Sequence, residues 1–201
     1  MASYFTALLI IFSSLAGLRA QPVMDRKRLA EFHELTERRV TDLQLYISMI
    51  ADKSLSPEQR EQAVELALSL FEKDYEVNGA RRSPYVQVSR RDGTVSAVPV
   101  GIYFKNLMRV KFDKVEITYY DAAVVSGFEK GADGSYHATA TYYQQFKGMD
   151  KNGNLVYGSR DRKDISVSAR SAAVYAHAGK EDLKVFFGDI TVKDTVPIPG
   201  F

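Results

Sequence analysis

The hydrophobic period of this 201-residue chain changes near residue 114, and that change most constrains the fold. Before it, apolar residues recur every three or four positions, which is typical of amphipathic helices. After it, apolar and polar residues alternate, as in strands that bury one face. The alternating segments are 115–126, 135–147, 155–170 and 183–193. Short turn-forming segments join the first three, so the pattern predicts an α+β fold, with N-terminal helices packed on a strongly curved antiparallel sheet.

Two helices and a short third one are predicted ahead of the four long strands. The first covers 24–52, and its apolar stripe is interrupted by Thr36. It is either a coiled-coil dimer arm or an amphipathic helix packed on its own domain, and the break in the stripe favours the second interpretation. Ser56 and Gln59 form a capping box for the second helix, and Pro99 opens the third. A short extended segment at 85–89 separates these two helices.

The N-terminal residues have the pattern of an export signal. Residues 7–16 form an uncharged apolar run, and Gly17-Leu18-Arg19-Ala20 follows and ends at a small residue, although Leu18 stands where a small residue is preferred. This predicts cleavage after Ala20, which leaves Gln21 as the first residue of a single domain, 21–201. An uncleaved anchor is the alternative, because the apolar run 2–18 reaches the lower limit for spanning a bilayer. This segment is the one contact with a membrane that the sequence predicts.

The composition restricts the partners and the chemistry. Lys and Arg number 27 against 25 Asp and Glu, so the chain lacks the basic excess of a nucleic-acid binder. It contains no cysteine, which excludes thiol chemistry and fits a periplasmic or secreted bacterial protein better than a disulfide-stapled one. The three histidines show no metal-ligand spacing, and no cofactor motif occurs. We therefore expect no metal and no cofactor.

Strand alternation predicts which side chains face the helices. Tyr119 and Asp121 on the first long strand and Tyr142 and Gln144 on the second share the inner face, and the turn at 131–134 brings them together. A carboxyl group buried beside tyrosines can act as a general acid or base, which makes Asp121 the catalytic candidate. The alternative is an Asp that is partly open to solvent and hydrogen-bonded to a tyrosine.

The outer face of the same strands carries candidates for a protein interface. They are Tyr120, Thr139, Thr141 and Tyr143, and tyrosine is enriched in interfaces. On the third strand, acidic residues are interspersed with basic ones along 160–164, including Asp161 and Lys163. The basic residues could form an anion-binding patch with Arg81–Arg82 and Arg90–Arg91, but the interspersed acids disfavour it. We interpret this charged run as a mixed solvated surface.

Three stretches within this order of helices and strands carry a resemblance to a known family. They are YFKNL at 103–107, YYQQFKG at 142–148 and FGDITV at 187–192. Together with the element order, over about residues 26–194, the chain resembles the nuclear transport factor 2-like superfamily, which has a cystatin-like cone. Within it, the chain is similar to small exported bacterial members with no assigned activity. The resemblance implies the fold but not the chemistry, because the superfamily includes isomerases, dehydratases, hydrolases, polyketide cyclases and pure interaction modules.

Two functions are therefore expected. The first is an exported, non-catalytic binding or protein-interaction module that takes a small apolar ligand, an envelope protein or a second copy of itself. The alternative is a cofactor-free lyase or isomerase with Asp121 as base and Tyr119 or Tyr142 as donor. The sequence favours the first, since it shows no convergent acid–base pair.

Overall fold

The computed structural model describes residues 25–73, 75–90, 92–132, 134–172 and 182–199. The predicted signal, residues 1–20, and its cleavage site lie outside them. The helices are α1 (Arg26–Ala51), α2 (Pro57–Ser69) and α3 (Val100–Met108). The strands are β1 (Glu76–Val77), β2 (Ala80–Arg81), β3 (Tyr85–Ser89), β4 (Val95–Pro99), β5 (Lys114–Val125), β6 (Glu129–Lys130), β7 (Tyr136–Met149), β8 (Leu155–Ala172) and β9 (Asp182–Pro197). In this part of the chain, no helix combines the length and the apolar character needed to cross a membrane.

Helix α1 buries its apolar stripe within its own chain, as the second interpretation predicted. Phe32, Leu43 and Ile47 are almost wholly buried. Thr36 lies in the same stripe and is also buried, and its hydroxyl donates to the Phe32 carbonyl at 2.7 Å. The polar interruption is therefore satisfied inside the helix, so it does not oppose packing.

Helix α2 begins where the capping box predicted and ties the other two helices together. Ser56 and Gln59 exchange the two hydrogen bonds of the box. From the first turn, the Arg60 guanidinium donates to the carbonyls of Ile50 in α1 and Met108 in α3, at 2.8 and 2.6 Å. These carbonyls lie at helix C-termini and lack intrahelical partners, so Arg60 satisfies both.

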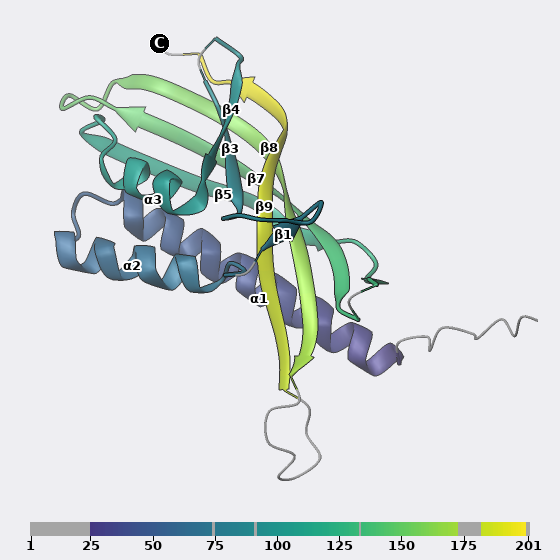
Figure 1. The fold of residues 1–201 in the computed structure, drawn as a ribbon. Helices are drawn as coiled ribbons and strands as arrows, with labels where there is room; N and C mark the ends of the chain where they lie inside the picture. Colours follow the sequence, from purple (N-terminus) through teal and green to yellow (C-terminus); the bar gives the residue numbers. More distant parts are fainter. Residues whose placement is uncertain (1–24, 74, 91, 133, 173–181, 200–201) are drawn as a thin grey trace, which may run out of the picture.

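Seven strands form the main sheet, in the order β4-β3-β9-β8-β7-β5, with β6 also paired to β7. The four long strands form the predicted antiparallel meander (Figure 1). The α+β class is confirmed, but the sheet is mixed, because β3 pairs β9 in parallel through Val86 and Ile190. The predicted wholly antiparallel sheet is wrong at this one pairing. The parallel pairing arises because the β3–β4 hairpin adds to the sheet edge beyond β9. The sequence predicted only part of this hairpin.

The last strand continues further than predicted. The predicted strand ends at residue 193, but β9 pairs through Pro197, which lies opposite Ser159. The next residue, Ile198, still donates its N–H to the Gly158 carbonyl at 2.9 Å. Pro197 is tolerated because it lies at the end of the strand, where a missing donor costs little.

The sheet is strongly bent, and the helices lie inside the bend (Figure 1). Bulges interrupt the pairing between Tyr120 and Val124 and between Ile165 and Val167, and bulges bend and twist a strand locally. The core lies between the helices and the concave face. Its largest buried side chains include Phe32, Phe104, Tyr142, Ile165 and Phe187.

Candidate functional site

A cavity of about 470 Å³ lies between α3, the β3–β4 hairpin and the concave face of β7 and β8. Its position follows from the sheet order, since β3 and β4 extend the sheet beyond β9 and curve over α3. The cavity has an aromatic end near the β7–β8 turn and a polar end farther along the two strands. This combination of an apolar wall with a few converging polar groups is typical of small-molecule sites.

Three rings form the aromatic end. Phe146 on β7, Tyr157 on β8 and Phe112 in the segment before β5 pack against one another, with ring centroids 5.8 to 6.1 Å apart. Leu107 and Val110 complete this wall from the α3 side. Such a surface favours a flat apolar group, because aromatic rings gain both from area burial and from offset or edge contacts.

Asp161 is the centre of the polar end. It is only 6% exposed, and hydroxyl groups from three strands surround its carboxylate. Ser89 and Thr195 donate to Oδ1 at 2.9 and 2.8 Å, and Ser159 donates to Oδ2 at 3.4 Å. Hydroxyl donors of this kind stabilise the ionised carboxylate in a buried place.

Lys163 lies two residues further on the same strand and is 3% exposed. Its Nζ atom is 4.0 Å from Asp161 Oδ2, beyond hydrogen-bond distance. Burial lowers the pKa of Lys163, and the negative charge of Asp161 only partly opposes this. The two residues form an ion pair of opposite charges. Within the described ranges the ammonium forms no hydrogen bond, so the N–H donors of Lys163 are unused.

Gln144 faces this pair from β7, in register with Asp161 on one side and Tyr119 on the other. It is 2% exposed, and its Oε1 atom has no hydrogen-bond partner among the residues that the structure describes. A buried acceptor without a donor costs on the order of 1–3 kcal/mol. Gln144 lines the cavity, so a bound molecule could satisfy it.

Three tyrosines close the site from the core side. Burial raises the pKa of Tyr103 on α3, and the charge of Asp161 adds to this shift. Burial also raises the pKa values of Tyr119 and Tyr142, whose rings lie 6.1 Å apart. All three hydroxyls therefore stay protonated at neutral pH and can act only as neutral hydrogen-bonding groups.

The predicted inner-face residues lie as follows. Tyr119 is opposite Gln144, and Tyr142 and Gln144 are buried on the concave face. The backbone of Asp121 falls in the bulge between Tyr120 and Val124. Its side chain lies outside the described residues, so the catalytic prediction at Asp121 stays untested.

Our interpretation of Asp161 and Lys163 as part of a solvated surface is wrong. The structure buries both on the concave face, whereas Arg160 and Arg170 on the same strand are exposed. The sequence did hold a signal for this. Ile165 and Val167 define the inner phase of β8, and counting back by twos places Lys163 and Asp161 on the same face.

The four interface candidates lie on the outer face of β5 and β7. Tyr120 and Tyr143 are exposed and opposite each other in register. The Arg160 guanidinium lies over the ring of Tyr120, 5.3 Å from its centroid. Thr139 is exposed, and Thr141 donates its hydroxyl to Asp164 at 2.7 Å. These contacts leave the interface a prediction.

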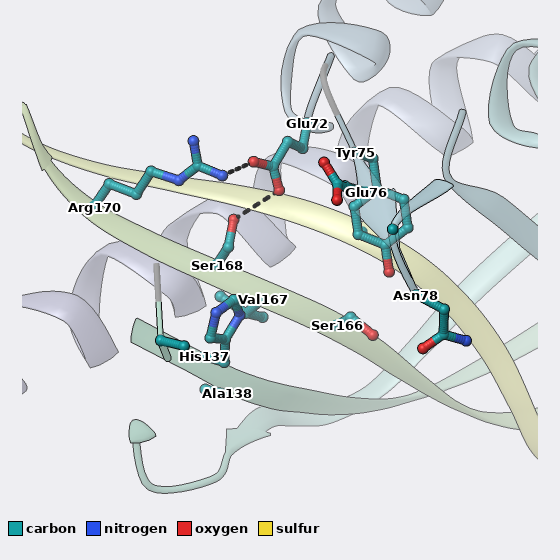
Figure 2. A pocket seen from close by; sticks show the side chains of 13 residues that line it. Glu72, Tyr75, Glu76, Asn78, His137, Ala138, Ser166, Val167, Ser168 and Arg170 are labelled. Carbon is teal, nitrogen blue, oxygen red and sulfur yellow. Dashed lines mark hydrogen bonds and ion pairs between the residues drawn. The ribbon is translucent and has the colours of Figure 1, made fainter. Parts of the chain in front are cut away.

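A second space, the outer hollow, lies beside the β1–β2 hairpin and has a volume of about 700 Å³ (Figure 2). Glu72, Tyr75, Ser166, Ser168 and Arg170 line it. Although it is larger than the cavity, two of its charged groups are paired: Glu72 accepts from Ser168 at 3.1 Å and forms an ion pair with Arg170. Its third charged residue, Glu76, is exposed. None of the buried unpartnered atoms of the described residues belongs to its lining. The cavity is therefore the better candidate site.

Comparison of the chain with family models, with curated proteins and with solved structures gives no match. In the described ranges, no group of three or more His, Asp or Glu side chains is placed to hold a metal ion. The geometry of the cavity therefore supplies the argument for function.

Proposed function

We propose that this protein is an exported member of the nuclear transport factor 2-like superfamily that binds a small ligand in its cavity without catalysing a reaction. The element order and the bent sheet around the helices support the superfamily. The export proposal depends on the sequence of residues 1–20. The predicted homodimer or envelope partner would use the outer face, opposite the cavity.

One observation carries the ligand proposal: Gln144, whose buried Oε1 atom has no hydrogen-bond partner among the described residues, is part of the lining of a cavity of about 470 Å³. Native proteins rarely leave a buried acceptor without a donor. The cavity can hold a molecule of roughly drug-fragment size or larger, since ligand sites are usually about 300–1,000 Å³. A ligand that reaches Gln144 would supply the missing donor.

The same geometry favours binding over acid–base catalysis. The Asp161 carboxylate already accepts from three hydroxyl groups, at 2.8 to 3.4 Å. A carboxylate has about four lone-pair sites, so the protein's own hydroxyl groups already occupy most of them. Asp161 is therefore better suited to hold its neighbours in place than to take a proton from a substrate.

The experiment is a titration of the purified full chain with Nile red, an uncharged fluorescent dye with an apolar ring system. We expect saturable one-to-one binding with increased emission. Ser96→Phe should fill the cavity and weaken binding about tenfold or more, because Ser96 lies on the cavity wall.

Ala97→Phe is the matched control, because Ala97 is the next residue of β4, is exposed and points to the other face. It should bind the dye like the wild type. Equal binding by all three proteins would place the dye on the surface and contradict the proposed site. Circular dichroism of both variants checks that the fold is kept.

A further inference from the structure

We propose that the ligand of this cavity is an uncharged apolar molecule with a hydroxyl group, and that the hydroxyl lies between Lys163 and Gln144. This inference rests on the proposed function and names the class of ligand. It follows from two polar groups whose hydrogen-bonding capacity is unused, and from the charge balance around them.

The strand register places the two groups close together on one face. Lys163 lies opposite Tyr142, and Gln144 lies opposite Asp161, on the neighbouring strands β8 and β7. Lys163 and Gln144 are therefore diagonal neighbours, and such pairs have Cα atoms roughly 7–8 Å apart. Both line the cavity, so one small group between them can contact both.

Lys163 needs a hydrogen-bond acceptor from the ligand, whereas the Oε1 atom of Gln144 needs a donor. The ammonium of Lys163 only donates, and its nearest carboxylate oxygen is 4.0 Å away. The Oε1 atom of Gln144 only accepts, and it has no donor in the described part of the chain. A hydroxyl group donates one hydrogen bond and accepts two. A single hydroxyl can therefore accept a hydrogen bond from Lys163 and donate one to Gln144.

The charge of the site argues for an uncharged ligand. The formal charges of Asp161 and Lys163 cancel, and both side chains are almost fully buried. A carboxylate head would lie close to Asp161, and an ammonium head would lie close to Lys163. An ammonium head would be buried without a free counter-charge, which is strongly unfavourable. The remaining charged residue of the lining, Arg90, is exposed, so it offers a carboxylate head only a solvated counter-charge.

The other end of the cavity indicates the body of the molecule. Phe112, Phe146 and Tyr157 form an aromatic wall, in which Phe146 lies two residues from Gln144 along β7. A flat ring system that carries its hydroxyl at one edge can pack on this wall and still reach Lys163 and Gln144.

Three matched naphthalenes test the class: 2-naphthol, 2-methylnaphthalene and 2-naphthoate. The first is uncharged and hydroxylated at neutral pH, the second lacks the hydroxyl and the third is an anion. Displacement of Nile red from the full chain gives their affinities. We expect 2-naphthol to bind about tenfold or more tightly than either of the others, because only it satisfies the buried pair.

Gln144→Leu should remove most of this preference and retain binding of 2-methylnaphthalene. Gln145→Leu is the matched control, because it makes the same change at the next position of β7, which has the opposite orientation, and should keep the preference. Lys163→Met removes the donor on the other side of the hydroxyl and should also reduce the preference for 2-naphthol. Its melting temperature checks that the variant is folded.

Equal affinity for 2-methylnaphthalene or 2-naphthoate would overturn the hydroxyl assignment. So would a failure of all three compounds to displace bound Nile red, although the cavity would then stand as a site. If Nile red itself does not bind, the proposed function fails together with this inference. The two failures are therefore distinguishable in one series of titrations.

Discussion

Two carboxylate–cation pairs in this protein show opposite geometries. Arg82, which follows β2, donates to both oxygens of Asp189 on β9, at 2.8 and 2.6 Å. The Tyr85 N–H adds a third hydrogen bond to Asp189 at 2.7 Å. In the cavity, Lys163 and Asp161 are 4.0 Å apart and share no hydrogen bond.

The difference fits a structural role for the Arg82–Asp189 pair and the proposed binding role for the Lys163–Asp161 pair. The Arg82 pair satisfies both partners, and the guanidinium also lies over the rings of Tyr75 and Tyr85, at 5.2 and 4.4 Å. It fastens the segment that carries β1 and β2 to β9. The cavity pair satisfies the carboxylate and leaves the ammonium incomplete, which is what a site needs if a ligand is to complete it.

The largest effect should come from breaking the buried pair. Asp161→Ala removes the one counter-charge of Lys163 within salt-bridge distance in the described structure, and it leaves three hydroxyl groups without their acceptor. We expect the free energy of unfolding to fall by about 3–5 kcal/mol, the usual cost of leaving one partner of a buried ion pair. Urea denaturation at pH 7 measures this.

The double variant Asp161→Leu with Lys163→Met separates the loss of a charge from the loss of volume. Apolar replacement of a whole buried pair is often neutral or stabilising, so the double variant should recover most of the loss. If both variants lose the same stability, the pair is not the cause, and the packing around residue 161 is.

The fold could be predicted largely from the hydrophobic period and from the capping and turn residues. The stripe through Phe32 and Leu43 defines α1, the Ser56 capping box begins α2, and the turns at 131–134 and 150–154 set the meander. The parallel pairing of Val86 with Ile190 could not be predicted, because it joins segments over a hundred residues apart in the chain. No local pattern specifies such a pairing.

The site was harder to predict, because hydrophobicity was the guide to the inner face. That guide located Tyr119, Tyr142 and Gln144, since apolar residues flank them in phase. It missed Asp161 and Lys163, because charged residues are rarely buried unless they are paired. Strand phase alone would have located both. The sequence offers no signal that Ser89 and Thr195, from two other strands, would supply the hydroxyls.

An intermediate effect is expected for the Arg82–Asp189 pair, and it should depend on pH. Burial raises the pKa of Asp189, but the hydrogen bonds from Arg82 and the Tyr85 N–H outweigh it and leave the pKa below its ordinary value. A carboxyl group with a lowered pKa stabilises the fold above its unfolded pKa, about 3.9, and this stability is lost as the pH falls through the folded value.

Asp189→Asn should therefore cost roughly 1–2 kcal/mol at pH 7, discounted because the pair is partly exposed. The difference from the wild type should shrink as the pH falls from 5 towards 3, as followed by urea unfolding at each pH. A difference that stays constant over this range would mean that the charge of Asp189 contributes nothing and that the side chain acts only through its shape.

The smallest effect should come from a third ion pair. This pair tests whether a short distance alone makes an ion pair contribute to the free energy of unfolding. Arg38 and Glu34 are 2.8 Å apart on α1, much closer than Lys163 and Asp161, but their side chains are 64% and 73% exposed. Water already solvates both charges, so Glu34→Gln should change the free energy of unfolding by no more than about 0.5 kcal/mol.

Added salt should reduce even this difference, whereas it should leave the Asp161→Ala effect nearly unchanged, because buried pairs are poorly screened. A cost above 1 kcal/mol for Glu34→Gln, on the order of a factor of five in the folding equilibrium, would show that exposure does not separate the three pairs. The order expected here, from Asp161 to Asp189 to Glu34, follows burial and not distance.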